Sequence, residues 1–399
     1  MTQNERFVLD LAAALHACGI PSHRLENTMM SVCETLSINA DFSVTPEMVL
    51  VAFHSVNNTH THMLKLRGSE LHLEKMTELD LLIEQIKDHS FDAEKGCAEV
   101  KRINQLSERF PTWVNVLSVP VSTASAACLF GGGYAEILVS AIIGTFIGLL
   151  IQLLSFFPNL SKLTVLFSAV FAIFISKYAQ LFLGSYAVEI ATITGLILLI
   201  PGFTLSLSIT ELANGHAQSG TIRFSGALIT FIMIAVGIGL GSQLAANIHG
   251  SASVFHFNTM PFWVSHIALA LVPAGFLVLF KAHTKEYPWM LLACAISFYS
   301  MKQLSEYELG DLAVFFSAAT LGLTANLISR IVAKPVTILL VPGIILLVPG
   351  SIGFKSISFL VNEQTLNGLE SAVSTLISAA SLTAGLLFSN MVIRLNKGF

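Results

Sequence analysis

Three charged side chains stand inside or at the ends of long apolar stretches, where a charge is costly. They are Lys177, Glu189 and Glu211, and Asn326 takes the place of Lys177 in the second half of the chain. Ionisable groups at membrane depth usually serve ion pathways or proton relays. We therefore expect Lys177, with Glu189 or Glu211, to couple proton movement to a conformational change. The alternative is that the glutamates are interfacial and Lys177 extends outward to the headgroups.

Two Pro-Gly pairs interrupt unusually long apolar stretches, at Pro201-Gly202 and at Pro349-Gly350. Proline removes a helical hydrogen bond and glycine loosens the backbone, so each stretch is predicted to be a broken helix. A broken helix exposes N–H groups at one half-helix and carbonyl groups at the other. The N–H end attracts a carboxylate, and the carbonyl end attracts an ammonium or a coupling cation. A zwitterionic amino acid suits such a pair of ends.

Hydroxyl side chains lie close to both breaks and could bind a polar ligand. Thr204 and Ser206 follow the first break, and Ser351 follows the second. Ser168 and Ser317 occupy equivalent positions in two similar segments. The alternative for each hydroxyl is helix packing, a common use of Ser and Thr in membranes.

The segment Gly19-Ile-Pro-Ser-His-Arg-Leu-Glu26 is the most distinctive part of the polar N-terminal region, with Arg24 and Glu26 as its charged members. It is either a functional element or a helix-turn-helix corner whose second helix is capped. His60 and His62 lie on one face of a predicted strand, but they lack partners at metal-ligand spacing.

Several classes of function leave no signature in the chain. There is no Walker A loop, no His-Glu-x-x-His and no Gly-x-Ser-x-Gly, so we expect neither an ATP-driven pump nor an enzyme. The five cysteines form no ligand spacing, and no metal or cofactor is expected. The net charge of −4 gives no indication of nucleic acid as a partner.

The elements that position these residues follow from composition. The chain has 399 residues, of which 54% are hydrophobic and 12% are charged. It has 21 basic and 25 acidic residues, and 26 of these charged residues together precede Phe110. Soluble chains carry about 25% charged residues. We predict a cytoplasmic α+β domain over 1–110, with strands near 48–53 and 61–67 and helices near 77–88 and 92–109. The rest is predicted to be an α-helical membrane protein of about ten transmembrane helices, over 113–130, 134–155, 162–183, 186–212, 221–245, 262–282, 286–303, 311–331, 335–362 and 367–393.

The two halves of the membrane region resemble each other. Leu163–Ala169 matches Leu312–Ala318 at five of seven positions with an offset of 149. At an offset of 148, Pro201-Gly202 falls on Pro349-Gly350 and Gly220 falls on Gly368. Five helices per unit predict a 5+5 inverted repeat, with repeats over 111–250 and 251–399, as in many secondary transporters.

The distribution of Lys and Arg predicts the orientation of the membrane region. With the N-terminus inside, the inner loops hold eight basic residues and the outer loops hold two. Basic residues are in excess on the cytoplasmic side of a membrane. Both termini are therefore predicted to be cytoplasmic.

Three segments of the chain resemble the threonine/serine exporter family, in a fused form of what some bacteria make as two subunits. They are Leu11 to Glu26, Leu199-Ile-Pro-Gly-Phe203 through Gly215 to Gly220, and Leu347-Val-Pro-Gly-Ser-Ile-Gly353. The resemblance covers essentially the whole chain. It implies proton-driven export of threonine and serine from the cytoplasm across a bacterial inner membrane. The expected partners are the small-molecule substrate, protons and the lipid bilayer, and a homo-oligomer is compatible with the sequence.

Two other functions remain open. Members of the split form of the family have been linked to dicarboxylate export, so succinate is an alternative substrate. A membrane-anchored sensor or enzyme, with the soluble domain as its active unit, is the second alternative. Broken helices argue against a mere anchor, because an anchor needs no interrupted backbone in lipid.

Overall fold

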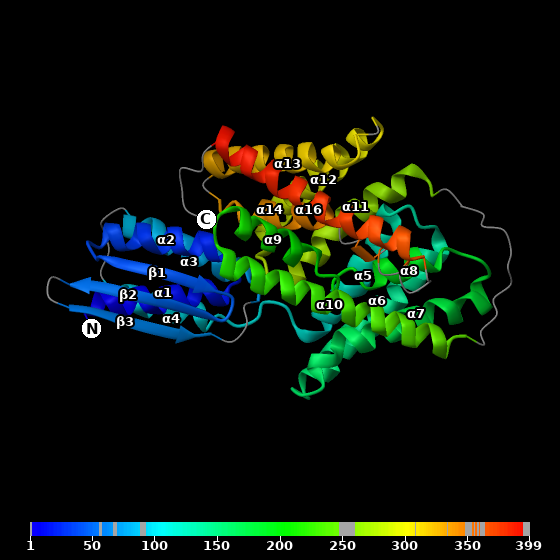
Figure 1. Cartoon of the computed structure of the whole chain (residues 1–399), viewed down its shortest axis with the longest axis horizontal. Coiled ribbons are helices and arrows are strands. Elements are labelled where there is room, and N and C mark those ends of the chain that lie inside the picture. Colours follow the sequence, from blue (N-terminus) through cyan, green and yellow to red (C-terminus); the bar gives the residue numbers. More distant parts are fainter. Residues whose placement is uncertain are drawn as a thin grey trace.

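The structure is a computed structural model that combines a small α+β unit with a bundle of long helices (Figure 1). It describes residues 2–55, 58–66, 70–87, 93–246, 260–307, 309–332, 334–347, 353–354, 356, 359 and 364–393. Pro349, Gly350 and Ser351, the predicted second break, lie outside the described residues.

The N-terminal unit packs helices on one face of a three-stranded antiparallel sheet of order β1-β2-β3. Alternate residues of β2 are buried, with Val49, Val51 and Phe53 at most 1% exposed against a core that includes Phe7 and Leu11. The two predicted strands and two predicted helices are present, and β1 was not predicted from the sequence. The elements are α1 (Gln3–Ala17), α2 (Ser22–Thr35), β1 (Ala40–Thr45), β2 (Met48–Ser55), β3 (Asn58–Lys65), α3 (Leu73–Lys87) and α4 (Ala93–Asn104).

The second part of the chain is helical. Among the described residues, seven helices are long and apolar enough to cross a membrane. These are α5 (Thr112–Leu129), α6 (Tyr134–Ser155), α7 (Thr164–Leu183, extended at its start by a 3-10 turn), α10 (Ala217–Leu244), α11 (Phe262–Leu279), α13 (Asp311–Val332) and α16 (Thr365–Val392). The other three predicted spans correspond to the pair α8 (Val188–Gly195) and α9 (Gly202–Ala213), to α12 (Tyr287–Ser305), and to α14 (Thr337–Leu347).

The first predicted break is present in the structure. Helix α8 ends at Gly195, a run of turns follows, and α9 starts at Gly202 with Pro201 directly before it. Proline has no backbone N–H and a fixed φ, so it is favoured at the start of a helix and disfavoured in its interior. The position of Pro201 directly before α9 fits this preference. Pro342-Gly343 behaves differently, because α14 continues through it.

Two helix pairs use the same glycine contact. A Cβ atom on Gly237 of α10 would lie 2.6 Å from the Ala169 Cβ of α7. A Cβ atom on Gly385 of α16 would lie 2.9 Å from the Ala318 Cβ of α13. Gly237 and Gly385 are separated by the offset of 148, and Ala169 and Ala318 by the offset of 149, that relate the two halves of the sequence.

The N-terminal unit packs directly on the helical bundle. The backbone N–H of Leu73 at the start of α3 donates to the carbonyl of Phe280 at 2.9 Å, and Lys281 forms ion pairs with Glu70 and Glu108. The hydrophobic core of the unit continues into α11 through residues such as Phe276. The two parts therefore share one core on this side of the bundle (Figure 1).

Candidate functional site

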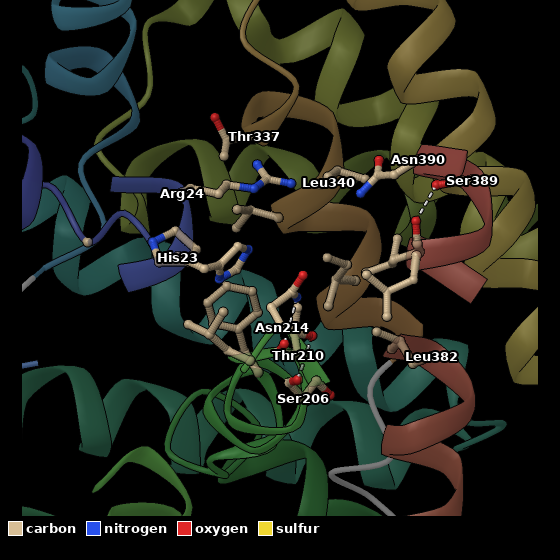
Figure 2. A pocket seen from close by; sticks show the side chains of 18 of the residues that line it. His23, Arg24, Ser206, Thr210, Asn214, Thr337, Leu340, Leu382, Ser389 and Asn390 are labelled. Atoms are coloured by element: carbon tan, nitrogen blue, oxygen red, sulfur yellow. Dashed lines mark hydrogen bonds between the residues drawn. The ribbon is translucent and has the colours of Figure 1, made fainter. Parts of the chain in front are cut away.

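A cavity of about 280 Å³ lies between the N-terminal unit and the helical bundle. We call it the interface cavity, lined by the α1–α2 corner and by α9, α14 and α16. Figure 2 shows His23 and Arg24 entering from the corner, with α9 on another side. Its polar side chains are His23, Arg24, Asn27, Ser206, Thr210, Asn214, Thr337, Ser389 and Asn390.

Helical spacing places the polar residues of α9 on the cavity. Ser206 and Thr210 of α9 and Asn214, which caps the end of the helix, are four residues apart and therefore lie on one side of it. The Thr210 hydroxyl donates to the Ser206 carbonyl at 2.9 Å, and the Asn214 amide donates to the Thr210 carbonyl at 2.7 Å. Figure 2 shows this row of side chains below Arg24.

Three buried polar atoms of the lining residues have no hydrogen-bond partner in the described part of the chain. They are His23 Nδ1, Ser206 Oγ and Thr337 Oγ1. Buried polar atoms are nearly always hydrogen-bonded, because leaving one unpaired costs about 1–3 kcal/mol. A polar ligand in the cavity would supply the missing partners.

The charge of the cavity comes from one side chain. Arg24 is partly buried, and no ion pair or side-chain hydrogen bond holds it within the described residues. Burial, followed by the charges of Arg24, His216 and Arg223, lowers the pKa of His23 to about 3, so its ring is neutral at physiological pH. No Asp, Glu or Lys is found among the described lining residues. The cavity therefore carries a single positive charge.

The corner between α1 and α2 holds the N-terminal unit on the turn between α9 and α10. The Ser22 N–H donates to Glu211 Oε1 at 3.0 Å, and Arg223 Nε lies 3.1 Å from Glu211 Oε2. The Ser219 hydroxyl lies 2.7 Å from Ser22 Oγ. Gly19 makes the sharp corner with a φ of 83°, a left-handed conformation that glycine adopts without strain.

Glu26 also helps to hold the α1–α2 corner against the residues between α9 and α10. Its Oε1 accepts from the Val44 N–H at 2.7 Å, and its Oε2 lies 3.4 Å from His216. Burial raises the pKa of Glu26. The segment 19–26 is thus a helix-turn-helix corner, and it also places His23 and Arg24 on the interface cavity.

A second cavity, of about 470 Å³, surrounds the break between α8 and α9. We call it the break cavity. Pro201, Gly202 and Thr204 line it together with mostly apolar residues of α5 and α11. Phe203 and Leu71 line both cavities. Phe203 thus stands between the broken helix and the polar interface cavity.

Some of the predicted site residues line the interface cavity, some line the break cavity, and others line neither. Ser206 lines the interface cavity, whereas Pro201, Gly202 and Thr204 line the break cavity. Asn326 lies behind the interface cavity, where its amide donates to Asn390 Oδ1 at 3.0 Å. Ser168 on α7 and Ser317 on α13 are buried in their helices and line neither cavity.

The structure does not bring Lys177 to the two glutamates. Glu211 is fully buried and pairs with Arg223, and Glu189 is exposed at the start of α8. Within the described residues, no hydrogen bond or ion pair joins Lys177 to either carboxylate.

Several lining residues were not singled out from the sequence. Thr337, Asn390 and Asn214 come from three helices that are distant in the chain. Only Asn214 carried a local signal, the four-residue spacing that it shares with Thr210 and Ser206. Arg24 belonged to the distinctive N-terminal segment, without an indication of what it faces.

Comparison with known proteins identifies the family. Residues 6–245 match a family model described as a threonine/serine exporter, and residues 265–392 match a second threonine/serine exporter model. The chain belongs to the threonine/serine exporter family. Both models describe the family as exporters, which are membrane transporters.

Similar chains occur in fungi. Pheromone-regulated membrane protein 10 of Zygosaccharomyces rouxii is 24% identical over 417 residues, covering 100% of this chain and 42% of that protein. An uncharacterized protein of Schizosaccharomyces pombe is 23% identical over 421 residues, covering 99% of this chain and 54% of that protein. The chain spans about half the length of the curated relatives it matches. No solved structure matches it.

Proposed function

We propose that this exporter-family chain moves small hydroxylated amino acids, threonine and serine, out of the cytoplasm. The observation that carries the proposal is the pair of unpartnered hydroxyls, Ser206 Oγ and Thr337 Oγ1, on the interface cavity. They come from α9 and α14, which belong to opposite halves of the chain. A ligand with its own hydroxyl and amine would satisfy them.

The size of the cavity supports a small substrate. Ligand pockets usually measure about 300–1,000 Å³, so the interface cavity lies at the lower end of that range. Its walls are otherwise apolar, with Leu340, Val341 and Leu382 among them. Such a site favours a compact polar molecule over a peptide or a nucleotide.

We further propose a 5+5 inverted repeat as the machinery of transport. The matched glycine contacts of α7 with α10 and of α13 with α16 support it. A second matched pair also supports it. Ser356 donates to the carbonyl of Gly368 in the second half, and the equivalent residues of the first half, Ser208 and Gly220, are also in contact. In this proposal the break at Pro201-Gly202 and the pair Pro349-Gly350 form the midplane site to which substrate passes from the interface cavity.

Orientation and proton coupling complete the proposal. The excess of Lys and Arg on one side supports a cytoplasmic position for the N-terminal unit, and with it for the interface cavity, in a bacterial inner membrane. Lys177 stays the proposed intramembrane coupling residue. Lys177→Ala is expected to abolish gradient-driven export while counterflow persists, and unchanged gradient-driven export would contradict this role.

Counterflow in proteoliposomes tests the substrate. Vesicles holding the full chain are preloaded with unlabelled threonine, serine or succinate, and uptake of labelled threonine is followed with and without a proton gradient. We expect accumulation that serine competes away and succinate does not. Absence of threonine exchange in folded protein would overturn the amino-acid substrate, and exchange of succinate would favour a dicarboxylate carrier. Ser206→Ala with Thr337→Val should weaken threonine competition, whereas Ser185→Ala, outside both cavities, should not.

A further inference from the structure

Within the described residues Arg24 has no counterion, although the carboxylates of Glu26 and Glu211 lie close to its helix. Glu26 is two residues away on α2, a spacing that turns the two side chains to different faces of the helix. Glu26 contacts Val44 and His216, and Glu211 contacts Ser22 and Arg223. The neighbouring acids are therefore used to hold the corner in place, and the guanidinium is left facing the cavity (Figure 2).

An unpaired guanidinium in this position needs an anion. The same cavity is lined by Leu340, Val341 and Ile344, which give it an apolar wall. A partly buried charge without a partner is unfavourable, and the attraction of an opposite charge is strengthened where water is excluded. Guanidinium groups bind carboxylates through two parallel N–H···O bonds, which fixes both the position and the direction of the ligand.

We infer that Arg24 binds the carboxylate of the transported molecule, so that the N-terminal unit supplies part of the transport site. This inference rests on the proposed function and names the residue that selects the substrate class. The amine of an amino acid then faces the neutral oxygens of Ser206, Thr337, Asn214 and Asn390.

The single charge also selects against dicarboxylates. Since His23 is neutral and no other cation lines the described part of the cavity, a second carboxylate would be buried without a partner. Breaking or omitting one partner of a buried ion pair is strongly unfavourable. The site is therefore expected to accept one carboxylate per ligand.

The inference is tested with Arg24→Gln, Arg24→Lys and the control Arg6→Gln, whose side chain is exposed. Binding to the purified full chain is measured by thermal shift with threonine, lactate, succinate and threoninol, which lacks the carboxylate. Wild-type protein should bind threonine and lactate and discriminate against threoninol and succinate. Arg24→Gln should weaken threonine about 10- to 100-fold, the range for a charged hydrogen bond, and bind threonine no better than threoninol. Arg24→Lys should retain part of the discrimination.

Stability without ligand separates this role from a structural one. Because Arg24 has no side-chain partner among the described residues, Arg24→Gln should melt at or above the temperature of the wild-type protein. A lower melting temperature, or unchanged preference for threonine over threoninol in Arg24→Gln, would overturn the inference. If the wild-type protein exchanges no threonine but binds lactate through Arg24, the amino-acid substrate fails and the carboxylate site stands. Equal wild-type binding of succinate would overturn the selection against dicarboxylates.

Discussion

Asp80 is a buried carboxyl group of α3 in the core of the N-terminal unit, with 9% of its surface exposed. Burial, with a smaller contribution from Glu84, raises its pKa from 3.8 to about 7, and Lys87 opposes the shift. The folded state therefore binds this proton more tightly than the unfolded state. Its contribution to stability is full below about pH 4 and is lost as the pH rises toward 7.

Asp80→Asn is expected to remove that pH dependence. The variant should resemble the wild-type protein at pH 4 and be more stable at pH 8, by up to on the order of 4 kcal/mol. Melting of the detergent-solubilised chain at both pH values measures the difference, with the exposed Glu34→Gln as control. A wild-type-like loss of stability between pH 5 and 8 in Asp80→Asn would show that another group is responsible.

Residue roles were only partly predictable from the sequence. Glu211 was singled out as an unusual charge in an apolar stretch, and its partners are Arg223, twelve residues later, and Ser22 of the N-terminal unit. A sequence gives the cost of such a charge, whereas the fold decides what offsets it. The role of Arg24 could not be predicted from the sequence, because the residues around it come from helices hundreds of residues away in the chain.

At the scale of elements, matched glycines set the closest helix contacts. Gly237→Val and Gly385→Val would each insert a side chain against Ala169 or Ala318. Overpacking of this kind costs about 1–3 kcal/mol, so both variants should melt earlier in detergent. Gly239→Val is the matched control, since nothing lies within 4 Å of its Cβ position. Equal melting of all three variants would contradict the contact and with it the proposed repeat.

Phe203 forms the second element-scale feature, at the start of α9 between the two cavities. Phe203→Ala should join the cavities and raise passive efflux of threonine from loaded proteoliposomes severalfold. Phe203→Trp should slow counterflow. Phe182→Ala, an exposed residue of α7, serves as the control. Efflux at the control rate in Phe203→Ala would show that the ring is no barrier.

The break at Pro201-Gly202 could be predicted because proline and glycine act locally on the helix. Strand β1 was not predicted, since its sequence Ala-Asp-Phe-Ser-Val-Thr alternates only weakly and is stabilised by pairing with β2. Pro342 shows the limit of the local rule, because α14 continues through it. Neighbouring helices and side chains can satisfy the freed backbone groups in a bundle.

At the scale of the whole molecule, the contact of Ser22 with Ser219 joins the N-terminal unit to α10 across 2.7 Å between the two oxygens. Ser22→Cys with Ser219→Cys should form a disulfide on oxidation, since the two side chains already meet. If substrate release requires the N-terminal unit to move, the oxidised double variant should lose counterflow and regain it on reduction. Each single variant is the control. Full activity with the disulfide formed would show that the unit stays in place during transport.

The interface cavity takes His23 and Arg24 from the first residues, Ser206 from the middle of the chain, and Thr337 and Asn390 from the last helices. If this cavity binds the substrate, as proposed, neither half of the polypeptide has a complete binding site by itself. A gene of this kind could be divided between residues 246 and 260 and still give a working protein, provided that both products meet in the same membrane. The two genes would then have to be inherited together, because a cell that kept only one would make a protein with an incomplete cavity.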